Sequence, residues 1–152
     1  MTTQDPSRSQ TSTMSEYTST IEGHQRAMKW ALTGPPKEAK EYVEALSTPT
    51  FYHIMNGQRL SYDAYVRGME EWRSKVSHYE PMVQEFLRDG DMLAARMTGT
   101  IKVDGAETEF ESYMFAQLDS AGRMEWLKER SVWGPVGGTA DKGTDLGRGA
   151  HY

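Results

Sequence analysis

The sequence predicts a single α+β domain in which helices precede an antiparallel sheet and cover one of its faces. In the first half of the chain, apolar residues recur at helical spacing, as at Ala39, Tyr42, Val43 and Leu46. From residue 91 to residue 133, apolar and polar side chains alternate with a period of two, which is typical of strands. Helices gathered ahead of an antiparallel sheet are the pattern of α+β folds.

Three helices are expected ahead of the main sheet. The first begins at Ser15 or at Ser19, where Ser19 and Glu22 fit a capping box, and it stops at the Gly-Pro-Pro sequence 34–36. The second follows directly and ends before Pro49. Ser61 is a suitable N-cap for the third, because its hydroxyl can accept hydrogen bonds from the first free backbone N–H groups.

Five strands are expected. The first, at residues 50–55, is rich in β-branched and aromatic residues and precedes the turn signal Asn56-Gly57. The second runs from about residue 78 to residue 87. The remaining three form a meander within residues 91–133, because turn signals divide that stretch at 103–105 and 119–122.

The alternation assigns the meander side chains to two faces. One face carries charges of both signs, which attract across strands: Arg96, Glu109, Glu111, Lys128 and Arg130. This phase puts Glu129 on the apolar face beside Ser112 and Met114, where an unpaired carboxylate is costly to bury. Glu129 is therefore the residue that most needs an explanation. In the opposite phase, which the apolar residues of the third strand also allow, Glu129 would be solvated.

Composition argues against several classes of function. The 152 residues suit one domain, and the lack of cysteine excludes disulfides and thiolate chemistry. A net charge of -5 without a basic cluster argues against nucleic-acid binding. No window approaches the roughly 18 apolar residues of a membrane span, and no signal-peptide core is evident, so we expect a cytoplasmic protein. The four histidines lack metal-ligand spacing, and no metal or organic cofactor is expected.

The two ends of the chain differ in composition from the middle. Residues 1–14 are rich in Ser, Thr and Gln, and we expect them to be disordered. Residues 134–152 are rich in glycine and poor in apolar residues, which indicates a flexible tail. The folded domain is therefore predicted to span residues 15–133.

Three stretches carry a resemblance to a known superfamily: FYHIMNGQRLSYDAYVRGMEEW (51–72), FLRDGDMLAARMTGT (86–100) and AGRMEWLKERSVW (121–133). They resemble the NTF2-like superfamily and, within it, the SnoaL-like group, particularly small fungal members that serve natural-product pathways. The resemblance covers about residues 16–133. It implies a cone, in which a strongly curved sheet wraps over three N-terminal helices and leaves a pocket between them.

The resemblance implies two classes of function. Its enzymes are isomerases, cyclases and dehydratases that use acid/base residues without a cofactor, and other members are non-catalytic binding or dimerisation domains. Two family activities do not carry over residue by residue. The steroid-isomerase pattern has an aspartate where this chain has Tyr52-His53-Ile54, and the dehydratase pattern needs a Tyr-Asp pair where Tyr17 is followed by Thr18.

Four residues are candidates for proton transfer. Glu129 is the preferred general base or acid, because a desolvated carboxyl group holds its proton more readily and suits catalysis near neutral pH. His53 and His78 are possible partners, since histidine titrates in the same range. Tyr113 falls on the charged face by strict alternation, but a bulge would turn it toward the pocket, where it would bind a substrate oxygen.

The expected substrate is a small, largely apolar natural product. We predict that its binding residues are Trp30, Tyr52, Met97, Ser112, Met114, Ser131 and Trp133. Trp72 is either a further wall of the pocket or a core residue. Only one of the neighbours Tyr52 and His53 can face the pocket, and the sequence leaves this choice open.

The charged face of the sheet also predicts a partner. Tyr113, Phe115 and Trp126 lie among its charges, and a purely solvated face would not need three large aromatic side chains. Aromatic residues and arginine are enriched at the centres of protein interfaces. We therefore expect a homodimer packed sheet to sheet, with its pockets facing away from the interface.

Overall fold

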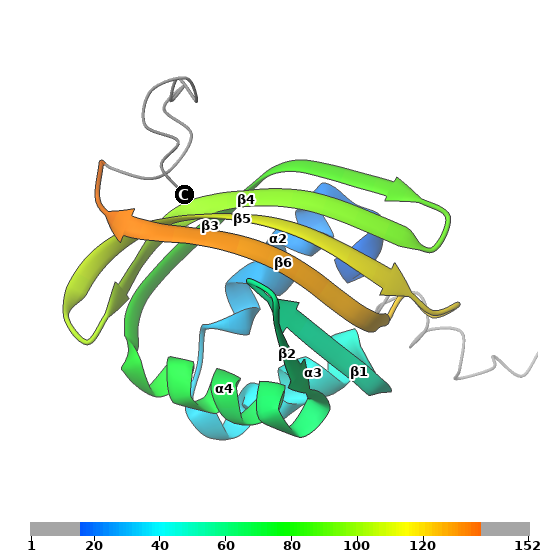
Figure 1. Cartoon of the computed structure of the whole chain (residues 1–152), viewed down its shortest axis with the longest axis horizontal. Helices are drawn as coiled ribbons and strands as arrows, with labels where there is room; N and C mark the ends of the chain where they lie inside the picture. Colours follow the sequence, from blue (N-terminus) through cyan, green and yellow to red (C-terminus); the bar gives the residue numbers. More distant parts are fainter. Residues whose placement is uncertain (1–15, 138–152) are drawn as a thin grey trace, which may run out of the picture.

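The structure is a curved six-stranded sheet with helices beneath its concave face (Figure 1). It is a computed structural model and describes residues 16–137. Helices precede and underlie the long strands, which confirms the predicted α+β class. The disordered segment expected at residues 1–14 lies outside the described residues, as does most of the flexible tail expected at residues 134–152.

The layer beneath the sheet contains three helices: α2 (Ile21–Ala31), α3 (Ala39–Leu46) and α4 (Tyr62–Lys75). A shorter helical piece at residues 16–19 precedes α2, and the 3-10 turn η1 (Pro36–Glu38) lies between α2 and α3. The cap of α2 is Thr20, whose hydroxyl accepts a hydrogen bond from the Gly23 N–H at 3.0 Å, so the prediction of Ser19 is wrong by one residue. Ser61 caps α4 as predicted.

Six strands form the sheet: β1 (Ser47–Met55), β2 (Gln58–Ser61), β3 (Val76–Asp89), β4 (Met92–Val103), β5 (Ala106–Leu118) and β6 (Met124–Pro135). Their order across the sheet is β2-β1-β6-β5-β4-β3. Neighbouring strands are antiparallel except for β1 and β6, which pair in parallel. The sequence predicted neither the short β2 nor this parallel pairing, which places the first long strand beside the last.

A two-residue turn fixes the register of β4 against β5. At the β4–β5 turn, Asp104 and Gly105 have φ values of 48° and 82°, which are the left-handed values that a type I′ turn requires. The pairing of β4 with β5 then continues without a bulge, so the alternation is kept along both strands. As a result Phe110 and Met114 are 1% and 2% exposed on the concave side, as the sequence predicted.

The convex face carries the predicted charges. The Arg96 guanidinium on β4 donates to Glu85 on β3 at 2.6 Å and to Glu111 on β5 at 3.1 Å. These pairs tie three strands together on the side that faces away from the helices. The two-faced arrangement of the meander is therefore confirmed.

One histidine in the core predicts how stability depends on pH. His24 on α2 is fully buried, and its ring lies 5.4 Å from the Phe86 ring, centroid to centroid. Burial lowers the pKa of His24 from 6.5 to about 4. The unfolded chain therefore binds a proton more readily than the folded protein as the pH falls.

We expect the free energy of unfolding to decrease by roughly 3 kcal/mol between about pH 6.5 and pH 4 because of this group alone. Below that range His24 is protonated in both states and contributes no further change. A His24→Leu variant should lack this part of the pH dependence. Urea unfolding of both proteins over this pH range checks the prediction, and parallel curves would contradict it.

Candidate functional site

A cavity of about 370 Å³ lies between the concave face of the sheet and the helices. This volume is within the range of small-molecule sites. Most of the lining residues have apolar side chains: Met28, Ala31, Leu32, Met55, Leu60, Met69, Met97, Met114 and Leu127, with the rings of Trp72, Phe110 and Trp133. A smaller set of polar side chains also lines the cavity: Tyr42, His53, Asn56, Tyr65, Tyr79, Ser112, Glu129 and Ser131. An apolar wall with a few convergent polar groups is typical of a ligand-binding pocket.

Glu129 points into this cavity from the middle of β6. It faces Met114 across the β5–β6 ladder, and its side chain is only 12% exposed. Leu127, Ser131 and Trp133 lie on the same face of β6 and also line the cavity. The structure therefore has the phase in which Glu129 faces inward, and its role in catalysis stays a prediction.

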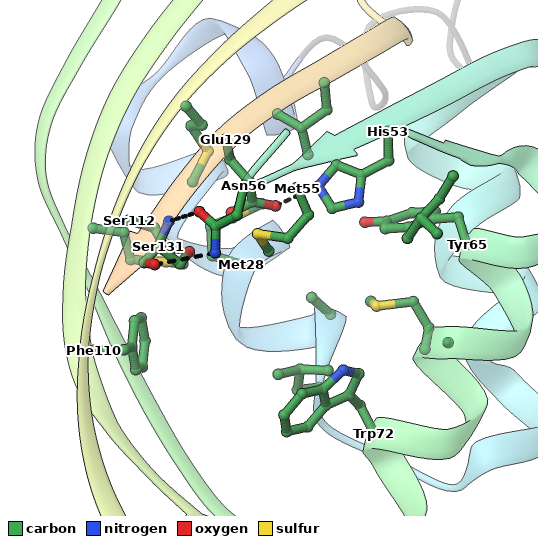
Figure 2. Close-up of a pocket in the computed structure, with 18 of the residues that line it drawn as sticks. Met28, His53, Met55, Asn56, Tyr65, Trp72, Phe110, Ser112, Glu129 and Ser131 are labelled. Atoms are coloured by element: carbon green, nitrogen blue, oxygen red, sulfur yellow. Dashed lines mark hydrogen bonds and ion pairs between the residues drawn. The ribbon is translucent and has the colours of Figure 1, made fainter. Parts of the chain in front are cut away.

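His53 is the direct partner of Glu129. The His53 Nε2 and Glu129 Oε1 atoms are 2.6 Å apart, and the two side chains are 4% and 12% exposed (Figure 2). The parallel pairing of β1 with β6 brings them together, because it aligns Met55 with Glu129 and His53 with Leu127. A short hydrogen bond between an imidazole and a carboxyl group in a dry site is suited to passing a proton between them.

Asn56 holds the end of β1 against β6. Its side-chain Oδ1 accepts from the Ser131 N–H at 2.9 Å, and its Nδ2 donates to the Ser131 carbonyl at 3.2 Å. Its backbone N–H also donates to the Glu129 carbonyl at 3.0 Å. The side-chain amide thus acts as one more peptide group in the parallel ladder (Figure 2). This clamp fixes the register that sets His53 beside Glu129.

Three tyrosines lie around the pair, of which Tyr42 and Tyr79 are buried and Tyr65 is half-buried. Tyr42, Tyr65 and Tyr79 come from α3, α4 and β3, and the Tyr65 ring packs edge-on against His53 at 4.9 Å between centroids. Burial raises the pKa of all three hydroxyl groups, and the charge of Glu129 raises each of them further. The three phenols therefore stay protonated and keep an O–H group to donate to a ligand oxygen.

A row of aromatic rings forms another wall of the cavity. Tyr79, Phe110, Trp133 and Trp72 stack one after another, with centroids 5.9, 5.2 and 5.7 Å apart. Trp72 and Trp133 are 40% and 39% exposed, whereas Phe110 is 1% exposed, so the row leads from the solvent into the interior. Figure 2 shows Trp72 and Phe110 at the end of the cavity away from His53 and Glu129.

Most of the predicted site residues meet at this cavity. Those that line it are His53, Met97, Ser112, Met114, Glu129, Ser131 and Trp133, and Trp72 lines it as well. The hydroxyls of Ser112 and Ser131 also hydrogen-bond to each other across β5 and β6. The sequence leaves open whether Tyr52 or His53 faces the pocket, and in the structure it is His53 that lines the cavity.

Two predicted residues lie on the convex side or at the edge of the sheet. Tyr113 is 50% exposed on the convex face, because β5 pairs with β4 and β6 without a bulge near it. His78 is exposed on β3, the edge strand farthest from β1. Neither lines the cavity. Tyr113 lies on the charged face that strict alternation predicts, and the bulge that would turn it toward the pocket does not occur at this point of β5. The predicted catalytic placement of His78 is corrected, because its side chain is exposed on the edge strand.

Two further predicted residues lie behind the cavity wall or outside it. Tyr52 alternates with His53 along β1, and its ring lies under the Arg59 guanidinium at 3.8 Å in a shallow depression. Trp30 packs edge-on against Tyr42 at 5.3 Å between centroids and supports that ring without lining the cavity. Neither is placed to touch a ligand in the cavity.

Sequence reasoning misses four polar residues of the site. Periodicity assigns Tyr42 and Tyr65 to apolar helix stripes, Tyr79 to a strand, and Asn56 to a turn. The sequence does contain a signal for Tyr42 and Tyr65, because a tyrosine on the apolar stripe of a helix buries a hydroxyl group that needs a hydrogen-bond partner. Asn56 gives no such signal, because Asn-Gly is explained fully by its turn.

Residues 16–137 contain neither a cluster suited to a metal nor a helix suited to a membrane. Nowhere in this range do three or more His, Asp or Glu side chains gather in a way that could hold a metal ion. None of the helices in the same range has the length and hydrophobicity needed to cross a bilayer.

No protein-family model matches the sequence, and no curated protein matches it. Several solved structures have a similar fold. PrhC from Penicillium brasilianum NBRC 6234 is 13% identical, with a TM-score of 0.59 over 82% of each chain. An LEH-like epoxide hydrolase from M. tuberculosis is 15% identical, with a TM-score of 0.56 over 71% of this chain and 81% of that chain.

A third similar structure carries the name of the fold. An NTF2-like protein of unknown function from Exiguobacterium sp. 255-15 is 17% identical, with a TM-score of 0.58 over 77% of this chain and 95% of that chain. The chain has the NTF2-like fold, which confirms the fold predicted from the sequence. Identities this low extend the likeness to the fold alone.

Proposed function

We propose that the protein is a cofactor-independent enzyme that rearranges a small, largely apolar natural-product intermediate by acid/base catalysis. An isomerase or cyclase of the SnoaL-like type in fungal secondary metabolism is the function we favour, with a dehydratase as the nearest variant. One observation carries the proposal: His53 Nε2 and Glu129 Oε1 lie 2.6 Å apart inside an apolar cavity. Fold similarity alone would not support a reaction.

The chemistry that this arrangement supports is a proton shift next to a carbonyl group. The Glu129 carboxylate takes a proton from carbon, and the electron pair of that C–H bond moves into an enolate on the ligand. A tyrosine hydroxyl, for which Tyr65 is best placed beside His53, donates to the enolate oxygen. The proton then returns to another carbon, and His53 holds the carboxyl group in place and shares its proton meanwhile.

The test is proton exchange into a simple ketone. Neutral bicyclic ketones such as 1-tetralone are incubated with the protein in D₂O, and the loss of the α-proton signals is followed by NMR. We expect exchange that saturates with ketone concentration and exceeds the rate in buffer. If the α-protons of none of these ketones exchange faster with the protein than in buffer, the acid/base proposal fails.

A second candidate is a binding domain without chemistry. It is favoured by the apolar wall, in which five methionines, Met28, Met55, Met69, Met97 and Met114, can adjust to ligands of different shape. Saturable binding of a ketone without any exchange would support this candidate over the enzyme. The same experiment therefore separates the two functions.

The convex face supports the proposal of a homodimer. Tyr113, Phe115 and Val132 are 50%, 57% and 56% exposed there, beside Arg130 and Lys128. Such a mixture of apolar rings and charges can meet its own copy about a two-fold axis. The cavity opens on the opposite side of the sheet, so each subunit would keep its own site.

Replacing both Phe115 and Trp126 by Lys is expected to give a folded monomer, because like charges would meet across the interface. Light scattering measures the mass in solution, and circular dichroism checks that the variant is folded. An unmodified protein that is monomeric at micromolar concentration would refute the dimer.

A further inference from the structure

The cavity has no positively charged side chain to receive an anion. Among its lining residues, all within the described range, none is lysine or arginine. His53 is the only histidine among these lining residues, and its Nε2 is already engaged by Glu129 at 2.6 Å. An anionic group on a ligand would thus be buried without a counter-charge.

The one buried lysine or arginine among the described residues is held by hydrogen bonds to backbone carbonyls of the helical layer. Arg73 on α4 is 5% exposed, and its guanidinium donates to the carbonyls of Ala31, Trp30 and Pro35 at 3.0, 2.7 and 3.2 Å. These bonds cap the end of α2 and the loop that follows it. Arg73 therefore stabilises the helical layer and does not turn toward a ligand.

Other nearby cations face away from the cavity. Lys29 is paired with Glu80 at 3.0 Å, and Lys128 lies over the Trp126 ring at 4.4 Å. Arg130 on β6 lies opposite Tyr113 on β5 in the strand register, and Tyr113 is 50% exposed on the convex face. None of the three lines the cavity.

The carboxyl group of Glu129 makes the interior unfavourable for a second negative charge. Its influence reaches Tyr42, Tyr65 and Tyr79, whose pKa values it raises in addition to the larger effect of burial. These rings come from three separate elements, so the influence of Glu129 extends across much of the cavity. A ligand carboxylate would meet this repulsion and would also lose its hydration.

We propose that the ligand of this cavity carries no negative charge, so that carboxylic acids, phosphates and sulfates are excluded while ketones, esters, amides, lactones and alcohols are accepted. This inference rests on the proposed function in that it assigns the ligand to the same site. An acidic precursor must therefore have its carboxyl group esterified, amidated, closed into a lactone or removed by an earlier reaction before it reaches this protein.

The test compares two ligands of nearly the same shape, 2-naphthamide and 2-naphthoate, by isothermal titration calorimetry at about pH 8. Naphthoate is ionised there, and naphthamide is not. We expect the amide to bind at least ~100-fold more tightly, because the buried naphthoate loses its hydration and is also repelled by the charge of Glu129. Binding of neither ligand, or equal binding of both, would overturn the inference.

Two variants identify the source of the selectivity. Glu129→Gln removes the repelling charge with little change of shape, so the preference for the amide should narrow to within ~10-fold, because only the loss of hydration still disfavours the anion. Glu111→Gln removes a carboxylate of the convex face and should leave the preference unchanged. A preference that is the same in both variants would contradict the role of Glu129.

The binding and exchange experiments can fail separately. A clear preference for the amide together with no ketone exchange would retain this inference and remove the acid/base proposal. Ketone exchange together with equal binding of 2-naphthamide and 2-naphthoate would retain the acid/base proposal and remove this inference.

Discussion

A Glu129→Gln variant is expected to exchange ketone protons about 10²–10⁴-fold more slowly than the unmodified protein. Glutamine has nearly the shape of glutamate, and its side-chain oxygen can still accept a hydrogen bond from His53. The amide does not accept a proton from carbon under these conditions, so the base is lost while the cavity keeps its form. The measurement is the D₂O exchange assay with 1-tetralone.

The two members of the pair should behave as a unit. His53→Gln removes the group that lies 2.6 Å from Glu129 Oε1, so the carboxyl group loses both its anchor and its proton-sharing partner. We therefore expect the double variant to be no slower than the slower of the two single variants, since residues that act together are not additive. Independent, multiplying effects would show that His53 and Glu129 act separately.

The control for both variants is Glu111→Gln. Glu111 lies on the convex face, where it accepts a hydrogen bond from Arg96 at 3.1 Å and does not contact the cavity. Its replacement removes one carboxylate from the protein without touching the proposed site. Equal loss of exchange in Glu111→Gln and Glu129→Gln would contradict the proposed site.

The meander could be predicted because its information is local. Its turns are short and marked by glycine, and each turn fixes the register of the strands that it joins. A fixed register with a period of two then assigns every side chain to a face. Alternation of this kind predicts that Ser112, Met114 and Glu129 share the apolar face, and all three line the cavity.

The partner of Glu129 was less predictable because it depends on a distant pairing. The residues His53 and Glu129 meet only because β1 adds to the sheet in parallel beside β6. No turn connects these strands, so nothing local sets their direction or register. The sequence could offer His53 and Tyr52 as alternatives, and only the assembled sheet chooses between them.

The expected contacts of Tyr113 and Trp30 with the ligand are absent for different physical reasons. Tyr113 would reach the cavity only through a bulge in β5, whereas the register shifts of this sheet lie in β3 and near the start of β6. Trp30 does lie on the inner side of α2, but the Tyr42 ring stands between it and the cavity. Periodicity predicts the face of a helix or strand on which a side chain lies. It does not predict which side chains on that face reach the cavity.

The largest effect on stability is expected from Phe110→Ala, which should lower the free energy of unfolding by about 3–5 kcal/mol. The ring is 1% exposed and stacks between Tyr79 and Trp133, at 5.9 and 5.2 Å between centroids. It also lies over Gly99, where a Cβ atom would come within 2.8 Å of the ring. Two strands and the aromatic wall therefore lose their common contact when the ring is removed.

Phe115→Ala on the same strand is the matched control, because Phe115 is 57% exposed on the opposite face. Its replacement should change the free energy of unfolding by no more than about 0.5 kcal/mol, as is usual for exposed positions. Urea unfolding of both variants measures the difference, at a concentration where light scattering shows the same oligomeric state. Similar losses in the two variants would mean that the ring of Phe110 is not the contact that holds the aromatic wall to the sheet.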